Sequence, residues 1–513
     1  MLAGPVPAAA QQTPPPATVP PQTAQPTGPV RALTIDEAVE LALKNNLGLQ
    51  IERLNPQIQD ENIAAARSAY APILSTGVST SGSTSQPRSF TEGNEPFSND
   101  AISSSFTFTQ NSIPWTNGNI TAQWRGSRST TSVLRPPFNP NLSSSFSVQA
   151  GQPLLRNFLV NPVKNQIQQA VIARQITDIT LRQRVVGVER NVRQAYWALV
   201  GSIERLEVAR QNLQLSQEQL RANKVRVEVG TMAPIDIIAA QAEVAGNEEA
   251  VILAQAAIQA NEDNLRMLVL DSTAPDFWTA RIEPSNQPLL QPLEVDTDAA
   301  IKAALEARTD IVIARQQLRA TDLNLRLTKN ATLPDLALQA GLTGTASGGT
   351  QFAYDFDSDI PTGTTRRSFS QTLGDVFGFV YPNWSVGVNF SYPIGKAAAE
   401  ANHARATLQR RQDEAQLKQL ELGIVQQVRA QARNVTSNFQ RVQSTRLARE
   451  LAEQRYAAEQ KRFDVGLSTL FQLTQVQRDV VQQRNAELNA IIQYNQSLVD
   501  FQLVQVAPLG GGF

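Results

Sequence analysis

The residues that could carry out chemistry are few in this chain. Its 513 residues include no cysteine and a single histidine, His403, which lies beside Arg405 on a polar, helix-forming stretch. Zinc and copper sites are built from several imidazole or thiolate ligands, so the composition argues against either metal. We expect His403 to be a solvated helix position rather than a ligand.

The charged residues form no catalytic pattern either. Glu204, Arg205, Glu207 and Arg210 are spaced as neighbours on an exposed helix face, which favours pairing within the helix. No nucleophile elbow, phosphate loop or paired-carboxylate motif stands out. The formal charge of −1 gives no electrostatic footprint for nucleic acid. The sequence therefore predicts a protein that is not an enzyme, uses no cofactor or metal and binds no nucleic acid.

Very long helices must position these residues. The proline-free run 163–229 carries a heptad pattern, with apolar residues at alternating steps of four and three: Leu181, Val185, Val188, Val192, Ala195 and Leu199. At 1.5 Å per residue such a helix is about 100 Å long. A second run, between Pro393 and Pro508, also lacks proline. Two long helical hairpins are expected.

The chain contains an internal duplication. Asp36, Ala38, Ala42, Leu43, Leu49, Arg67, Pro72 and Leu74 recur 262 residues later as Asp298, Ala300, Ala304, Leu305, Ile311, Lys329, Pro334 and Leu336. The offset falls to 240 from Pro153 to Pro393, and to 236 from Gly230 to Gly466. About 22 extra residues therefore lie between residues 82 and 143 of the first copy.

The residue pattern of each copy predicts, in order, a short helix, a medium helix, a strand, a long loop, a strand, a very long helix, a Val-Gly turn and a medium helix. In the first copy these are 35–45, 48–70, 73–83, 143–153, 162–228 and 232–270; in the second they are 298–307, 309–332, 335–346, 383–393, 396–463 and 467–507. Thr34 and Glu37 fit a capping box at the first helix. The predicted organisation is a disordered Pro-rich linker at 1–31, repeats at 32–270 and 298–508, a connection at 271–297 and a tail at 509–513. Residues 6–10 are similar to the end of a secretory signal peptide.

The strand segments indicate a membrane. Apolar and polar residues alternate over about ten residues, as in Val386, Val388 and Phe390, which is typical of outer-membrane barrel strands. A soluble half-buried sheet has the same alternation. We favour the membrane because prolines bracket the strands at the junctions with long helices: Pro72, Pro153, Pro334 and Pro393. No apolar run approaches 18 residues, so no helix is expected to cross a bilayer.

The repeats, junction prolines, strands and long helices occur in the same order in both copies. In these features the chain resembles the TolC-like outer-membrane factor family, the outer membrane efflux proteins, over nearly all of residues 32–508. The segments that carry the resemblance further are 33–38, 70–72, 152–154 and 392–394, together with the paired Val-Gly turns. The resemblance implies a mainly α fold with transmembrane β-strands: a homotrimer with a shared twelve-stranded barrel in outer-membrane lipid and an α-helical barrel reaching into the periplasm. It implies a passive exit duct for efflux or type I secretion. A periplasmic adaptor would join it to an inner-membrane pump of RND, ABC or MFS type.

The resemblance also assigns site residues. The hairpin tips that meet the adaptor would be Val229, Gly230, Thr231, Val465, Gly466 and Leu467. The periplasmic gate would include Gln472 and Gln475, with Asp464 before the turn and Asp236 at the matching place in the first hairpin. Since the family's gate is often acidic, these residues suggest a less charged one. The alternatives are that both glycines are only helix C-caps and that both glutamines are ordinary solvated positions.

The extra segment of the first copy predicts a further hairpin. Phe106 and Phe108, then Ile120 and Trp124, alternate on either side of a turn at 114–119. The hairpin, at about 103–127, could lie outside the barrel or add two strands per chain, giving eighteen in a trimer. We favour twelve strands, because the barrel must match a twelve-helix tube.

Two rival interpretations remain open at this point. A soluble helical scaffold would explain the heptads and repeats but not the alternating strands. An outer-membrane receptor or structural barrel protein without an efflux role would keep the barrel, with the loops 84–142 and 347–382 as its candidate ligand sites.

Overall fold

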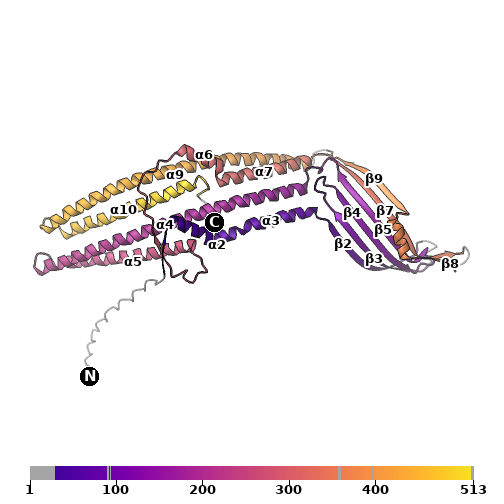
Figure 1. The fold of residues 1–513 in the computed structure, drawn as a ribbon, viewed down its shortest axis with the longest axis horizontal. Helices are drawn as coiled ribbons and strands as arrows, with labels where there is room; N and C mark the ends of the chain where they lie inside the picture. The colour runs from indigo at the N-terminus through magenta and orange to yellow at the C-terminus, as the bar shows by residue number, and fades with distance from the viewer. Residues whose placement is uncertain (1–28, 89–91, 93, 356–359, 395–397, 510–513) are drawn as a thin grey trace, which may run out of the picture. The chain divides into compact units, whose positions relative to one another are not determined.

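The computed structural model describes residues 29–88, 92, 94–355, 360–394 and 398–509. Figure 1 labels the helices and strands along the chain. The chain divides into two compact units. Unit 1 comprises Met1–Asn46, Val188–Pro292 and Asn438–Val499, and unit 2 comprises Leu47–Gly187, Leu293–Ser437 and Asp500–Phe513. The helices α4 (Pro162–Glu228) and α9 (Ala398–Asp464) each run from one unit into the other.

Unit 1 holds the two helical hairpins. Besides parts of α4 and α9, its elements are β1 (Val30–Leu33), α1 (Ile35–Asn45), α5 (Ile235–Val269), β6 (Arg281–Pro284) and most of α10 (Leu470–Leu503). Val192, Ala195 and Leu199 of the predicted heptad are buried. The heptad thus forms part of the core, and α4 has the bounds predicted for it.

The N-terminal segment is tied to the connection between the repeats. β1 pairs in parallel with β6, from Val30↔Arg281 to Leu33↔Pro284, a sheet that the sequence did not predict. The expected linker at 1–31 lies outside the described residues as far as residue 28, whereas residues 30 and 31 belong to β1. The capping box of Thr34 and Glu37 is confirmed at the start of α1.

A buried ion pair holds the connection against α5. The Arg266 guanidinium lies 3.3 Å from the Glu262 carboxylate and donates a 2.8 Å hydrogen bond to the Ala280 carbonyl. Glu262 in turn accepts a 2.7 Å hydrogen bond from the Ile282 amide. These bonds pair the two buried charges, as burial requires, while the Nε of Arg266 makes no hydrogen bond.

Unit 2 holds the remaining helices: α2 (Leu47–Glu52), α3 (Leu54–Arg67), the 3₁₀ turn η1 (Ser68–Tyr70), α6 (Thr297–Ala307), α7 (Thr309–Asn330) and α8 (Phe369–Phe377). The single helix expected at 48–70 is broken at Arg53. Pro56 explains the break, because its ring clashes with the carbonyl of Glu52 and so ends α2 there. None of the described helices of either unit combines the length and apolar character needed to cross a membrane.

Unit 2 also holds one large antiparallel sheet. Its strands are β2 (Ile73–Ser85), β3 (Phe97–Gln110), β4 (Asn119–Thr131), β5 (Phe138–Pro153), β7 (Asp335–Tyr354), β8 (Pro361–Arg367) and β9 (Pro382–Ser391). Neighbours follow the order β2-β3-β4-β5-β7, and both β9 and β8 pair with β7. β9 covers the part of β7 up to Gly344, and β8 covers the part from Gly349.

The extra hairpin lies inside this sheet, which corrects the arrangement favoured from the sequence. β3 and β4 are inserted between β2 and β5, and the β2–β3 ladder runs from Ile73↔Thr109 to Ser85↔Phe97. One chain therefore contributes six strand positions to the sheet rather than four.

The loop expected at 347–382 is also more ordered than predicted, since it forms β8 and α8. The side chains of Thr372 and Val376 are fully buried, and α8 packs on β5 and β7. The rings of Phe146 and Phe377 lie 5.2 Å apart. Gly344 permits this approach, because a Cβ there would lie 2.6 Å from the Val376 carbonyl oxygen.

Candidate functional site

The two hairpin tips have the same backbone geometry. Gly230 and Gly466 adopt φ of 76° and 78°, the left-handed region that glycine enters without strain. Thr231 N–H bonds to the Arg226 carbonyl at 2.9 Å and Leu467 N–H bonds to the Arg462 carbonyl at 2.8 Å. With Gly230 N–H and Gly466 N–H each bonded three residues back, both turns are Schellman caps.

Apolar side chains surround both tips and face solvent. Val465 and Leu467 are 70% and 71% exposed, and Val229 is similarly exposed. The sequence argument missed two more: Phe471 is 78% exposed and Ile235, its counterpart at a shift of 236, is also exposed. We call these five residues the tip patch. The signal was present in the sequence, because the repeat alignment places an apolar residue at both positions.

The expected gate residues lie near the tips, with local partners. Gln472 Oε1 accepts a 3.0 Å hydrogen bond from the Ser468 hydroxyl, and its own backbone N–H bonds to Thr469 Oγ1 at 3.3 Å. Gln472 thus helps to cap α10. Gln475 lies 3.5 Å from Asp479, one turn further along α10. Asp236 is half-buried in the first turn of α5.

Polar contacts tie the two hairpins together close to the tips. Arg226 of α4 donates a 2.9 Å hydrogen bond to Asp464 of α9, and its guanidinium lies 4.7 Å from the Phe463 ring centroid. Met232 of the first tip packs against a small cluster that contains Phe463 and Leu473. Asp464 is therefore held by the neighbouring hairpin.

Two further ties lie along the same helices. Arg478 of α10 bonds to Glu243 of α5 at 2.5 Å, and this hydrogen-bonded carboxylate raises the pKa of Arg478. Asn212 of α4 donates to Asn247 of α5 at 2.6 Å and accepts from Gln477 of α10 at 3.1 Å. Polar bonds rather than apolar packing alone thus join the hairpins.

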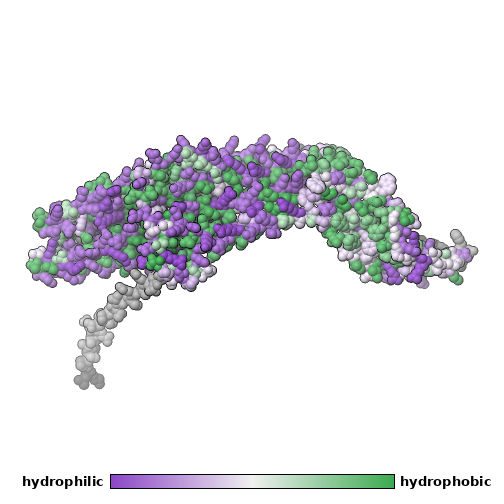
Figure 2. Space-filling model, viewed as in Figure 1, coloured by the Kyte–Doolittle hydropathy of each residue, from purple (hydrophilic) through white to green (hydrophobic). Residues whose placement is uncertain are grey.

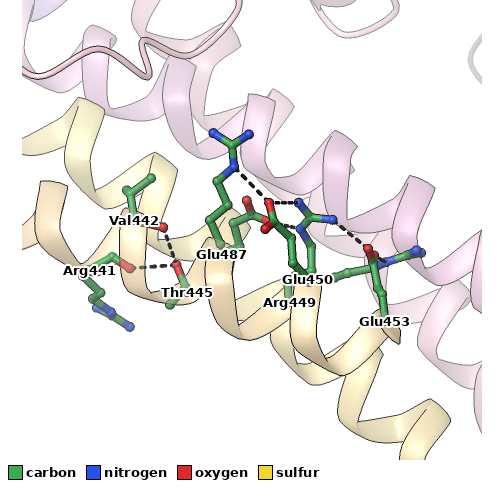
Figure 3. A network of polar contacts seen from close by, with 9 residues as sticks. Arg441, Val442, Thr445, Arg449, Glu450, Glu453 and Glu487 are labelled. Carbon is green, nitrogen blue, oxygen red and sulfur yellow. Dashed lines mark hydrogen bonds and ion pairs between the residues drawn. The ribbon is translucent and has the colours of Figure 1, made fainter. Parts of the chain in front are cut away.

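The second hairpin is fastened internally by an arginine network (Figure 3). Arg449 of α9 bonds to Glu487 of α10 at 2.5 Å and to Glu453 at 2.8 Å. Arg484 of α10 returns to Glu453 at 2.9 Å. These bonds join α9 to α10, so the second hairpin has polar ties of its own besides those to the first hairpin.

Two sequence expectations for polar residues need correction. His403 is half-buried and its Nδ1 is out of solvent, so it is not a fully solvated position. Arg205 bonds to Asn489 of α10 at 2.9 Å rather than to a neighbour on its own helix. Glu207 does bond within its helix, to Gln211 at 3.0 Å. In the part of the chain that the structure describes, no group of three or more His, Cys, Asp or Glu side chains is placed to hold a metal.

The sheet of unit 2 has one apolar face and one polar face. The registers place on one face Leu74, Val78, Phe106, Phe108, Ile120, Trp124, Phe146, Val148, Leu338, Leu342, Val386 and Val388. The other face carries small hydroxyl and amide residues such as Ser79, Ser103 and Ser145. Figure 2 shows hydrophobic residues gathered over the strands. Because many of the apolar side chains are exposed, this face needs an apolar surrounding.

The four junction prolines lie at the helix end of the sheet. Pro72 and Pro334 stand directly before β2 and β7, Pro153 ends β5 and Pro393 follows β9. The Arg156 guanidinium bonds to the Asp335 carboxylate there. Each proline therefore marks the change between strand and the segment leading to a helix.

A sheet with a continuous apolar face, joined twice in one chain to helices of 67 residues, defines the class of outer-membrane channels with a helical periplasmic part. The comparison with protein families identifies the family: residues 38–269 and 300–504 match the outer membrane efflux protein family, and the chain belongs to it.

Individual proteins agree with this assignment. The outer membrane efflux protein BepC of Brucella suis is 23% identical over 500 residues, covering 93% of this chain and 89% of BepC. The CmeC outer membrane channel of Campylobacter jejuni has a TM-score of 0.64 at 15% identity, covering 92% of this chain and 85% of CmeC. VceC of Vibrio cholerae has a TM-score of 0.64 at 14% identity, covering 93% and 97%.

The family and the fold settle the class of function. The protein is an exit duct in the outer membrane that extends into the periplasm, where helical hairpins of the two tandem repeats form an α-barrel. The strands belong to a β-barrel shared by a trimer, which works with a periplasmic adaptor and an inner-membrane pump. This decides against the soluble scaffold and against a receptor without an efflux role.

Proposed function

We propose that the duct conducts cargo passively and opens when an adaptor docks on the tip patch. The pump, of RND, ABC or MFS type, would supply the energy, and the cargo would be that of an efflux or type I secretion system. The apolar face of the sheet would contact outer-membrane lipid. The observation that carries the docking step is the exposure of the tip patch on both hairpins.

The tip patch suits a protein partner. Large apolar side chains exposed together are typical of interaction sites. Gly230 and Gly466 leave open space beside them, since a Cβ at either position would meet nothing within 4 Å. A partner could therefore approach the backbone of Val229, Thr231, Val465 and Leu467 closely.

The gate would consist of Asp236, Asp464, Gln472 and Gln475, held closed by the ties between hairpins. An exposed ion pair such as Arg226–Asp464 contributes about 0.2–1 kcal/mol. Free energies of this size, multiplied over three copies, can be overcome by an adaptor that binds the open arrangement more tightly. Weak ties thus fit a gate that opens on docking.

Docking can be tested with a tip variant and a matched control. The chain is expressed in cells together with its adaptor, cross-linked and purified, and the amount of adaptor that co-purifies is measured. For the triple variant Val465→Ser, Leu467→Ser, Phe471→Ser we expect this amount to fall at least about tenfold, since a hot-spot residue contributes about 2 kcal/mol or more.

The control is Leu290→Ser, which changes an apolar residue of the connection that is 54% exposed. It should recover adaptor normally. If the triple variant co-purified as much adaptor as the unchanged chain, with normal amounts of trimer in the membrane, the tips would have no docking role.

A further inference from the structure

The sheet of unit 2 has two edges without a partner strand in the described part of the chain. β2 pairs with β3 on one side only, and β9 pairs with β7 on one side only. Every residue of β9 is exposed, as is every residue of β2 except the last. In a bilayer each unpaired backbone group costs several kcal/mol, so both edges need partners.

The directions of the strands say which partner fits. Every neighbouring pair from β2 to β9 is antiparallel, so over six positions the two edge strands run in opposite directions. β9 of one chain can therefore pair antiparallel with β2 of a neighbouring chain. Six strands are too few to close around themselves, because eight already leave an interior just filled by side chains.

We propose that three chains close this sheet into a barrel of eighteen strands, in which β3 and β4 form part of the wall. The inference rests on the trimer of the proposed function and adds the composition of its wall. Barrel diameter grows roughly linearly with strand number, so the barrel is about 1.5 times as wide as a twelve-stranded one.

The hairpin is bonded into the wall on both of its sides. On one side the Ser79 and Ser103 hydroxyls lie 2.9 Å apart across β2 and β3. On the other side the Ser127 and Ser143 hydroxyls lie 2.6 Å apart across β4 and β5. Since β5 pairs with β4 and β7, it has no edge left for β2, which a twelve-stranded wall requires.

The side chains of the hairpin also continue both faces. Phe106 and Trp124 face each other and stand in the same row as Phe146 of β5. The apolar face therefore runs from β2 to β9 without a break at the hairpin. A hairpin outside the barrel would have no reason to match the wall in this way.

Engineered disulfides can test the wall, because the chain has no cysteine of its own. In full-length trimers in membranes, we expect Ser79→Cys with Ser103→Cys to oxidise to a disulfide within one chain, detected as a linked peptide by mass spectrometry. The matched pair Ser79→Cys with Ser145→Cys, which joins β2 to β5, should give less than a tenth of that yield.

A β2–β5 disulfide, or no β2–β3 disulfide, in variants that still assemble as trimers would overturn the eighteen-stranded wall and leave the exit duct intact.

A second experiment places a cysteine at Ser75 of β2 and another at Ser385, Gly387 or Asn389 of β9 in turn. We expect at least one pair to link copies covalently up to a trimer on a denaturing gel. Links within a single chain would contradict the shared barrel itself.

Discussion

The glycines at the hairpin tips separate cap geometry from partner contact. Valine at Gly466 would be forced into a left-handed conformation, a strain of about 1–2 kcal/mol, although its side chain would meet no neighbour. Asparagine tolerates that conformation, so it keeps the turn and only adds bulk.

We expect Gly466→Val to impair export more than it impairs folding, and Gly466→Asn to impair export as well, because both fill the space that the adaptor would occupy. Export of a dye from cells, with the amount of trimer measured alongside, checks this. Normal export with Gly466→Asn would mean that the glycine serves only the turn, and normal export with Gly466→Val would count against the tip assignment.

Charge in the wall has a separate consequence. Arg125 lies on the polar face of β4, opposite Ser105 and Ser145. In the proposed barrel a trimer would present three such guanidinium groups to the lumen. We expect Arg125→Glu to shift the reversal potential of single channels toward cation preference under a salt gradient, since fixed charges bias the ions in a pore. Arg128→Glu, on the opposite face of the same strand, is the control and should leave the potential nearly unchanged.

At the scale of elements, the ties between hairpins govern opening. We expect Asp464→Asn to raise the ratio of open to closed channels by about 1.5- to 5-fold per tie, the range that an exposed ion pair allows. Planar bilayer recordings measure this ratio. Glu450→Gln removes one negative charge from a contact within α9, with Arg446 at 3.4 Å, and should have little effect.

The cap of α1 gives a local prediction. The Thr34 amide and hydroxyl hydrogen-bond the Glu37 carboxylate and hold its pKa below its usual value. A lowered folded pKa means that the charged form stabilises α1 above the ordinary pKa, and that this stabilisation is lost as pH falls through the folded pKa. We expect Thr34→Ala to raise amide hydrogen exchange at the start of α1. A variant with unchanged exchange would show that packing alone holds this helix end.

Most elements were predictable because their signals are local or repeated. Heptads, junction prolines and the shared offsets located α4, α9, β2 and β9 to within two residues, whereas β5 begins five residues earlier and β7 ends eight residues later than predicted. The β1–β6 pair was not predictable, because strands of four residues carry little pattern. The place of the β3–β4 hairpin was predicted wrongly because alternation shows that a strand has two faces but not which strand it pairs with.

The candidate site was predictable in part for the same reason. Gly230 and Gly466 follow from the repeat and from the need for a positive φ. Asp464 and Gln472 were assigned through the family resemblance, and no local pattern could show that Arg226 reaches Asp464 from 238 residues away. Long-range side-chain contacts of this kind depend on how the hairpins pack.

At the scale of the whole molecule, the chain has two surfaces that are incomplete in a single copy. The sheet has open edges and an exposed apolar face, and the hairpins expose apolar residues along their length, such as Leu422, Leu447 and Leu451. Pairing with other copies covers both kinds of surface, as expected for a duct whose wall is shared.

Imaging of purified particles in a lipid environment tests this account most directly. We predict particles with threefold symmetry, in which a single β-barrel of eighteen strands opens into a tube of helical hairpins. A monomeric particle, or a barrel closed by the strands of one chain, would contradict the shared duct.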